Sequence, residues 1–299
     1  MATNQQLTPI LKWAGGKNQL IEYISQVLPQ EFGTTITKYA EPFVGGGAIL
    51  FYILQNYDLD EIYISDINAE LINMYIRIQD NVDEVISLLR RYEETYLPLP
   101  DYERRTFYYE KRDEFNELML NANEINAVMR ASLFIFLNRT CFNGIYRVNK
   151  KGQYNVPMGV NKNPTICNVS NLKAVSKALN KVNIVCGSYL DSEDFIDQST
   201  LVYFDPPYRP LKGMDNFTSY TEDDFDDDAQ KELAEYVRHI SSKGAHFILS
   251  NSDPKSSDPE DDFFDELYSE YNIQRISAKR IINRNVDSRG SITEILVSN

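Results

Sequence analysis

Seven short runs rich in β-branched and aromatic residues constrain the fold of this chain more than any other feature. They are TTITKYAEPF, EIYISD, VNIVC, LVYF, AHFILSN, YNIQRI and SITEILVSN, and they lie on either side of a long central stretch. Helical or loop segments separate most of them. This alternation is typical of α/β proteins, so we predict a sheet with helices on both of its faces.

The central stretch, from about Ala69 to Asn180, has a different pattern. Its segments ELINMYIRIQDNVDEVISLLRRYEETY and RDEFNELMLNANEINAVMRASLFIFLN carry helical periodicity. We therefore predict a largely helical insertion over residues 69–180. Residues 1–68 and 181–299 would then form one α/β domain.

The distribution of charge is more informative than its sum. A net charge of −14 argues against a nucleic-acid partner, because phosphate contacts need Lys and Arg. Residues 138–162 nevertheless carry several basic residues and no acidic one. By itself this segment is compatible with a polar solvated loop or with a nucleic-acid surface.

The composition also indicates the compartment and argues against a metal site. The start, MATNQQLTPILKW, has neither the basic nor the apolar part of a signal peptide, and no apolar run approaches the length of a membrane span. Three widely spaced cysteines and two histidines predict neither a disulfide framework nor a zinc site. We expect a cytoplasmic protein without a membrane segment or a metal.

The run LVYFDPPYRP, residues 201–210, ends a buried strand with a carboxylate, two prolines and a tyrosine. Two prolines after a strand are compatible with a simple stiff exit turn, because proline cannot continue the ladder. They are equally suited to holding the backbone around Asp205 in a fixed conformation. Asp205 is therefore a candidate for chemistry.

A second candidate site is the glycine-rich segment YAEPFVGGGAILF, in which a strand end precedes three glycines and an apolar helix start. Such a turn lets the backbone approach a ligand closely. Asp66 follows Gly47 by nineteen positions, where a second strand of a nucleotide-binding fold offers a carboxylate to ribose hydroxyls. The spacing predicts a nucleoside-containing cofactor and also suits NAD.

The segment LKWAGGKNQL is not a Walker phosphate loop. That motif needs glycine where Leu11 stands and Ser or Thr where Asn18 stands. Trp13, the single tryptophan of the chain, is equally compatible with a core anchor and with a flat wall over a cofactor.

Six ordered segments, LKWAGGK, EPFVGGG, SDIN, NRTCFNGIYRVNKKGQYNVPMG, DPPY and EILVSN, closely resemble those of the Dam-like DNA adenine methyltransferases. They extend from Leu11 to Asn299. The resemblance implies an S-adenosylmethionine-dependent methyltransferase (Rossmann-like) sheet with an inserted, mainly helical target-recognition domain. The chain departs from the family after NVPMG, where VNKN replaces the usual aromatic residue of the outer base contact.

The resemblance implies a site-specific, adenine-specific DNA methyltransferase. Such an enzyme transfers a methyl group from S-adenosylmethionine to the exocyclic amino group of adenine in duplex DNA by base flipping. The implied target is GATC. The alternative is an amino-methyltransferase of the same fold acting on cytosine or RNA. The turn argues against this alternative, because Asp rather than Ser or Asn stands before Pro-Pro-Tyr. A nicotinamide oxidoreductase is disfavoured because no second catalytic base follows.

The resemblance also implies roles for individual residues. The catalytic residues would be Asp205, Pro206, Pro207 and Tyr208. The S-adenosylmethionine-binding residues would be Trp13, Gly15, Lys17, Glu41, Phe43, Gly45, Asp66 and Asp205. The DNA-binding residues would be Lys12, Arg139, Phe142, Asn143, Arg147, Lys150 and Lys151. We expect a monomer that acts on double-stranded DNA without a metal, in some hosts beside a cognate restriction endonuclease.

Overall fold

The computed structural model describes residues 6–13, 17–210, 225–279 and 291–299. The chain divides into two compact units. The first, called here the helix unit, comprises Met1–Gly16, Gly45–Asn56 and Asp66–Cys186. The second, the sheet unit, comprises Lys17–Val44, Tyr57–Ser65 and Gly187–Asn299.

Six strands give the sheet unit its framework, and they pair in the order β2-β1-β4-β5-β7-β6. They are β1 (Lys38–Glu41), β2 (Glu61–Asp66), β4 (Thr200–Phe204), β5 (His246–Ser252), β6 (Asn272–Lys279) and β7 (Ser291–Ser298). The first four in this order are parallel, and β7 runs antiparallel to both β5 and β6. The carboxyl ends of β1, β4 and β5 therefore share one edge of the sheet.

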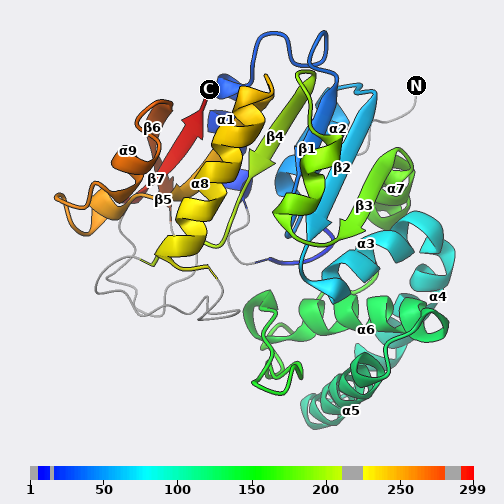
Figure 1. Ribbon diagram of the computed structural model, residues 1–299. Coiled ribbons are helices and arrows are strands. Elements are labelled where there is room, and N and C mark those ends of the chain that lie inside the picture. The colour runs from blue at the N-terminus through cyan, green and yellow to red at the C-terminus, as the bar shows by residue number, and fades with distance from the viewer. Residues whose placement is uncertain (1–5, 14–16, 211–224, 280–290) are drawn as a thin grey trace. The chain divides into compact units, whose positions relative to one another are not determined.

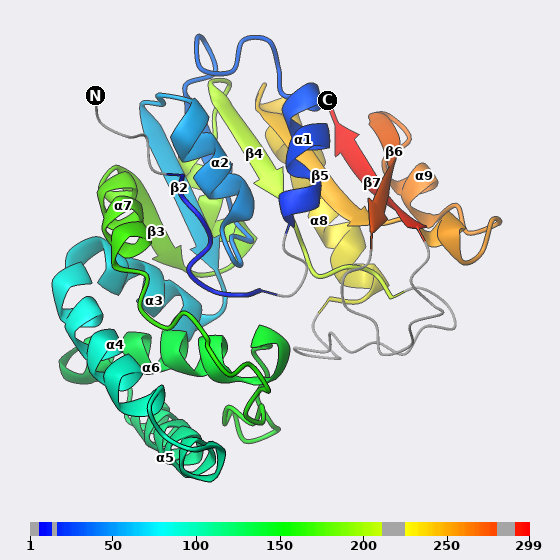
Figure 2. The same ribbon diagram turned by 180° about the vertical axis from the view of Figure 1, so that it is seen from behind.

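Helices cover both faces of this sheet. Helix α8 (Asp227–Ser242) lies in front of β4 and β5 in Figure 1, and α1 (Ile21–Val27) lies in front of the sheet when the view is turned by 180° (Figure 2). The unit also contains α9 (Phe263–Leu267) and the 3-10 turns η1 (Lys17–Gln19), η4 (Tyr189–Phe195) and η5 (Pro254–Ser256). Because helices take both faces, β4 is buried along its whole length and reads as a continuous apolar run.

Helix α8 begins in an acidic stretch of the sequence. The Asp226 carboxylate accepts hydrogen bonds from the backbone N–H groups of Asp228 and Ala229. An N-cap of this kind satisfies donors that have no partner within the helix, and acidic residues in the first turn interact favourably with the helix dipole.

The helix unit is built around α6 (Ala127–Thr140), which is buried on nearly all sides. Its other elements are α2 (Ala48–Asn56), α3 (Ala69–Asp80), α4 (Val82–Tyr96), α5 (Asp101–Leu120), α7 (Val169–Leu179), β3 (Val182–Cys186), η2 (Glu124–Asn126) and η3 (Phe142–Gly144). Helices α3, α4 and α5 all pack on α6. Aromatic rings fill the contact, with Phe134 stacked on Phe115 and Phe136 edge-on to Tyr96.

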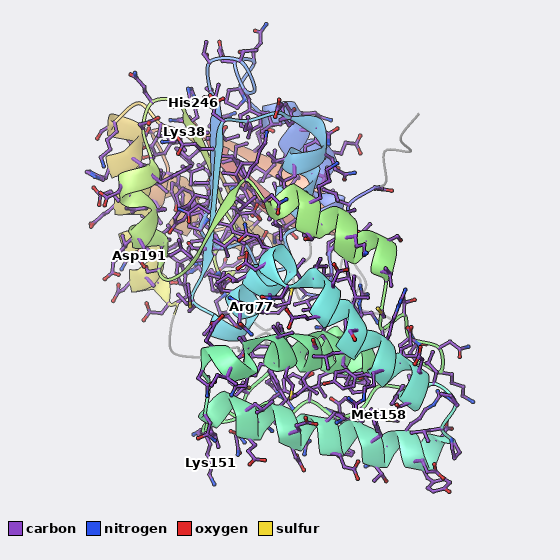
Figure 3. The ribbon with its side chains drawn as sticks, turned by 90° about the vertical axis from the view of Figure 1, so that its right-hand side faces the viewer. Lys38, Arg77, Lys151, Met158, Asp191 and His246 are labelled. Carbon is purple, nitrogen blue, oxygen red and sulfur yellow. The ribbon has the colours of Figure 1, made fainter. Side chains whose placement is uncertain are left out.

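The segment after α6 turns back along α5 (Figure 3, where Lys151 and Met158 are labelled). Bridges between Cys141 and Met158 and between Val148 and Tyr154 give it the form of an irregular hairpin. The Asn116 side chain of α5 donates to the Tyr154 carbonyl, and the Tyr108 hydroxyl donates to that of Val156. The segment called here the hairpin, residues 141–159, is thus held by the helix beneath it.

The predicted elements are confirmed where the sequence pattern was strongest. Each of the seven β-rich runs contains a strand, and the predicted α/β fold of the methyltransferase type is confirmed. The predicted helical character of the central stretch is also confirmed, since α3 to α7 lie within it. Among the helices of the described residues, none combines the length and the apolar character that a membrane crossing requires.

Candidate active site

Polar side chains gather at the edge where β1, β4 and β5 end. Strand β1 ends at Glu41, Asp205 directly follows β4, and Ser250 and Asn251 lie close to the end of β5. Parallel sheets bind their ligands at the carboxyl ends of their strands. The sequence DPPY therefore stands where a reaction site is expected.

Asp205 is held by two donors from other elements. Its Oδ1 lies 3.0 Å from the Lys17 ammonium and accepts a 2.9 Å hydrogen bond from the Ser250 hydroxyl. Lys17 itself is buried, and Ser250 is fully buried. Buried charges are tolerated when they are paired and hydrogen-bonded, and this pair satisfies both conditions.

The pKa of Asp205 is raised above its usual range. Burial disfavours the charged carboxylate and is the largest influence, while the Lys17 ammonium and the Ser250 hydroxyl act in the opposite direction. Lys17 thus opposes the effect of burial and favours the ionised form of Asp205.

Tyr208 is fixed in place through its hydroxyl group. The hydroxyl accepts a 2.7 Å hydrogen bond from Lys17 and donates one of 2.7 Å to the Glu294 carboxylate. Glu294 lies on β7, opposite Ser252 of β5. Burial, with the nearby Asp205 and Glu294 carboxylates, raises the pKa of Tyr208 well above its usual value, so the phenol stays neutral.

The DPPY turn keeps two acceptors available. Among the described residues, no group donates to Asp205 Oδ2 or to the Pro206 carbonyl. The Lys17 ammonium lies 3.9 Å from the centroid of the Tyr208 ring. A planar ligand that stacks on Tyr208 therefore uses the opposite face of the ring unless Lys17 moves.

Glu41 and Phe43 lie at and just beyond the end of β1. The Tyr39 hydroxyl donates a 2.7 Å hydrogen bond to the buried Glu41 carboxylate. Phe43 stacks on Tyr189, with ring centroids 5.5 Å apart. The sheet unit thus contains five of the residues predicted to bind the cofactor or perform catalysis in addition to the prolines: Lys17, Glu41, Phe43, Asp205 and Tyr208.

The helix unit contains the glycine-rich turn and Asp66. Both Asp66 oxygens accept backbone hydrogen bonds, Oδ2 from Gly45 at 3.2 Å and Oδ1 from Asn68 at 2.9 Å. Burial raises the pKa of Asp66, and these two bonds oppose that effect. Gly47 adopts φ +72°, and a Cβ there would lie 2.5 Å from the Tyr75 hydroxyl, so the turn requires glycine.

Trp13 is packed among aromatic rings of the helix unit. Its ring stacks on Tyr146, with centroids 6.0 Å apart, and meets the edge of Phe134 at 6.4 Å. Added at Gly46, a Cβ would lie 2.8 Å from Trp13. Trp13, which is partly exposed, therefore packs in this aromatic cluster and also lies against the glycine-rich turn. Gly15, another predicted cofactor residue, lies outside the described residues.

The side chain of Asn138 on α6 holds the backbone of the predicted DNA-binding residue Lys12 and that of Gly144, the neighbour of the predicted residue Asn143. The Asn138 side chain accepts from the Lys12 backbone N–H and donates to the carbonyls of Lys12 and Gly144. Asn143 and Gly144 both have positive φ, and a Cβ at Gly144 would collide with the Lys12 side chain. The approach of Lys12 to this turn thus depends on glycine.

The other predicted DNA-binding residues differ in their exposure. Phe142 is 46% exposed, and Lys150 and Lys151 are exposed near the tip of the hairpin. Arg147 is exposed, and its Nε donates a 2.8 Å hydrogen bond to Asn155 Oδ1. Arg139 is partly buried against the Pro9 carbonyl, and burial lowers its pKa.

Sequence reasoning missed several residues of this site. Ser250, Asn251 and Glu294 carry no role in a motif-based interpretation, although FILSN and EILVSN both mark strand ends in the sequence. Their side chains meet the DPPY turn only because β5 pairs with β4, and β7 with β5. The described residues bring no three His, Cys, Asp or Glu side chains together in a way that could hold a metal ion.

Comparison with known proteins decides the family. Residues 13–282 match the D12 class N6 adenine-specific DNA methyltransferases. The chain belongs to this family. The predicted resemblance to Dam-like enzymes is thereby confirmed, as is the prediction of an adenine-specific DNA methyltransferase.

Relatives of this D12-class chain cover nearly its whole length. It is 46% identical over 296 residues to the type II methyltransferase M.MjaIII of Methanocaldococcus jannaschii, with 98% of this chain and 99% of the relative covered. It is 35% identical to the type II methyltransferase M1.LlaDCHI of Lactococcus lactis, over 98% and 95% of the two chains. It is 32% identical to the DNA adenine methylase of Escherichia coli K12, over 96% and 93%.

Membership in the D12 class establishes the reaction at a coarse level. The substrate is DNA, the modified base is adenine, and the reaction requires a methyl donor. The alternative of a cytosine or RNA substrate is disfavoured by this assignment.

Replacing Lys17 with Met should move the pH dependence of turnover. Removing the ammonium raises the pKa of Asp205 further, so at a given acidic pH a larger fraction of the carboxyl is protonated. If turnover requires the ionised form of Asp205, activity is then lost at a higher pH as the solution is acidified. We expect the acidic limb of kcat against pH, measured at saturating substrates, to shift to higher pH. Lys231→Met, which removes an exposed ion pair with Asp228, is the control, and an unmoved limb in Lys17→Met would contradict the role of Lys17.

Proposed function

We propose that this D12-class enzyme transfers a methyl group from S-adenosylmethionine to the exocyclic amino group of adenine in duplex DNA, by base flipping and at the sequence GATC. The observation that carries the chemical part is the pair of acceptors in the DPPY turn, Asp205 Oδ2 and the Pro206 carbonyl. They follow a fully buried strand and have no donor among the described residues.

Two acceptors at this position suit the chemistry of an adenine amino group. Its nitrogen lone pair is delocalised into the ring, which makes the nitrogen a poor nucleophile. Asp205 and the Pro206 carbonyl would each accept one amino hydrogen, favour a pyramidal nitrogen and stabilise the positive charge that develops on it. Asp205 would also hold the proton that the nitrogen releases, with Lys17 and Ser250 supporting its charge.

The residues near Asp66 fit a nucleoside cofactor. Asp66 is only partly buried, and each of its oxygens has one backbone donor, which leaves lone pairs for two ribose hydroxyls. S-adenosylmethionine would supply an electrophilic methyl group on its sulfonium. Glu41, Phe43, Lys17, Gly45 and Trp13 are proposed as further residues that bind the cofactor.

We propose residues 69–180 as the target-recognition domain. The hairpin presents an aromatic ring, an arginine and two lysines to solvent, namely Phe142, Arg147, Lys150 and Lys151. Arg147 would read a guanine edge, because Asn155 occupies its Nε and leaves both terminal nitrogens for the two guanine acceptors. Phe142 would enter the base stack near the flipped adenine, and Lys12, Arg139 and Asn143 are proposed as further DNA contacts.

We further propose a cytoplasmic monomer that acts beside a cognate restriction endonuclease. The support is that two of its relatives are named type II methyltransferases. The proposal of the cytoplasm follows from the DNA substrate.

Asp205→Ala should reduce kcat by about 10²–10³-fold or more, because an acceptor that acts in the transition state is removed. Transfer of labelled methyl groups to duplexes that contain one GATC site measures the loss. Binding of S-adenosylmethionine, followed by calorimetry, should change much less. Asp60→Ala, which changes an exposed aspartate of the same unit, is the control. Near-normal turnover in folded Asp205→Ala would overturn the assignment.

Asp66→Ala should weaken the binding of S-adenosylmethionine by about 1.5–3 kcal/mol, as is usual for hydrogen bonds to a charged group. Calorimetry on the purified variant measures the change, and circular dichroism confirms that the variant is folded. An unchanged affinity would remove Asp66 from the cofactor site while leaving the assignment of the DPPY turn intact.

Arg147→Ala should weaken the binding free energy for the target DNA by about 1–3 kcal/mol and relax discrimination at one base pair. Lys150→Ala should instead weaken binding to all sequences similarly and lower the salt slope by about one unit. Methylation rates on GATC and on each single-base variant, at fixed salt, test both. Equal loss of rate on every duplex in Arg147→Ala would make Arg147 a phosphate contact. Absence of a GATC preference in the wild type would refute the target.

A further inference from the structure

The backbone of the DPPY turn has few donors of its own. Pro206 and Pro207 have no N–H group, so the turn cannot be anchored by a hydrogen-bond ladder at these positions. Proline fixes φ but leaves ψ free, and ψ decides where a carbonyl points. Something else must hold the peptide groups that follow Asp205.

Two fully buried amide side chains supply these contacts. Gln230 of α8 donates through Nε2 to the Pro207 carbonyl at 3.0 Å, and Asn251 of β5 accepts through Oδ1 from the Arg209 backbone N–H at 3.1 Å. The two amides are joined, since Asn251 Nδ2 donates to Gln230 Oε1 at 3.1 Å. A continuous chain of hydrogen bonds thus runs from the Pro207 carbonyl through the two amides to the Arg209 N–H.

The far side of the turn is fastened by neighbouring groups. The Ser252 hydroxyl donates to the Arg209 carbonyl at 2.7 Å. The Arg209 guanidinium forms ion pairs with Asp227 at the start of α8 and with Asp261. The turn is therefore fixed both to β5 and to α8, the two elements that carry the amides.

Burying two primary amides is costly unless all of their polar atoms are used. Among the described residues, no buried nitrogen or oxygen of Gln230 or Asn251 is without a partner. An apolar pair would fill the same space without this cost. The amides instead make directional contacts to the backbone of one turn, which is the arrangement expected of groups that orient it.

We propose that Gln230 and Asn251 are positioning residues for methyl transfer: together they hold the Pro207–Tyr208 peptide and the Arg209 N–H. Because the ring of Pro207 fixes its φ, holding the residues that follow Pro206 helps to aim the Pro206 carbonyl at the adenine amino group. This inference rests on the proposed roles of Asp205 and Pro206. Neither amide touches the substrate. Their effect passes through the backbone that bears the acceptors.

Gln230→Met tests the proposal because it keeps the volume of the side chain and removes the donor to Pro207. We expect kcat to fall on the order of 10- to 100-fold, the range produced when reacting groups are slightly misplaced. KM for DNA and the affinity for S-adenosylmethionine should change by less than about threefold, because neither amide contacts a ligand. Asn251→Ala should lower kcat similarly, and the double variant should lose far less than the product of the two losses, because the amides act as one unit.

Thr200→Val is the matched control. Thr200 is fully buried at the other end of β4, where its hydroxyl accepts from the Asp197 N–H at 3.0 Å. Its replacement removes a buried hydrogen bond from β4, the strand that leads into the DPPY turn, and should lower the melting temperature while leaving kcat unchanged. A general loss of stability would therefore show in Thr200→Val as well as in Gln230→Met.

Gln230→Glu adds a readout that a purely structural role would not move. The introduced carboxyl group can donate to the Pro207 carbonyl when it is neutral, whereas the carboxylate cannot. The kcat of this variant relative to the wild type should therefore be below one at high pH and rise towards one as the pH falls. A ratio that falls with decreasing pH would overturn the proposal.

The outcomes separate this inference from the proposed function. If Asp205→Ala abolishes turnover but folded Gln230→Met keeps kcat close to that of the wild type, the positioning role is wrong and the catalytic turn stands. If Gln230→Met loses affinity for S-adenosylmethionine in parallel with kcat, the amides serve cofactor binding and the proposal is again wrong. If Asp205→Ala itself is active, the proposed function fails first.

Discussion

The site depends on one electrostatic constraint, which is a carboxylate placed at the end of a strand buried along its whole length. Burial raises the pKa of Asp205, and the Lys17 ammonium at 3.0 Å and the Ser250 hydroxyl act in the opposite direction. The same ammonium donates a hydrogen bond to the Tyr208 hydroxyl, which in turn donates one to the Glu294 carboxylate. One buried cation therefore links the turn to two carboxylates, and loss of that cation leaves an unpaired buried charge.

Sheet topology explains why these groups meet. Strands β1, β4 and β5 are parallel and end at one edge, which brings Glu41, Asp205 and Ser250 to that edge. The antiparallel β7 then places Glu294 opposite Ser252, at the same end of β5. A parallel β7 would present its other end here. The antiparallel strand at this position thus contributes a residue that the parallel strands alone would not supply.

The helix unit solves a different physical problem, which is to hold an exposed, polar hairpin in one conformation. It does so from beneath, through hydrogen bonds from Tyr108 and Asn116 of α5 and through the Asn138 side chain of α6. Gly144 lets Lys12 approach because any Cβ would collide with it. The proposed DNA contacts are thereby mounted on a rigid helical base, although they project from a loop.

The sequence by itself determined the strands, the α/β class and the family, because these follow from local patterns and from the short segments that carry the resemblance. It also predicted Asp205 and Asp66 as candidate site residues, since each directly ends a β-rich run. Only the tertiary structure decided that Lys17 contacts Asp205 and Tyr208, although Lys17 and Tyr208 are 191 positions apart in the sequence. The same holds for the contact between Tyr208 and Glu294, which are 86 positions apart. The tertiary structure likewise joined Gln230 to Asn251 and showed Trp13 stacked on Tyr146. Such contacts depend on which strands are neighbours and in what register, and no local pattern of residues carries that information.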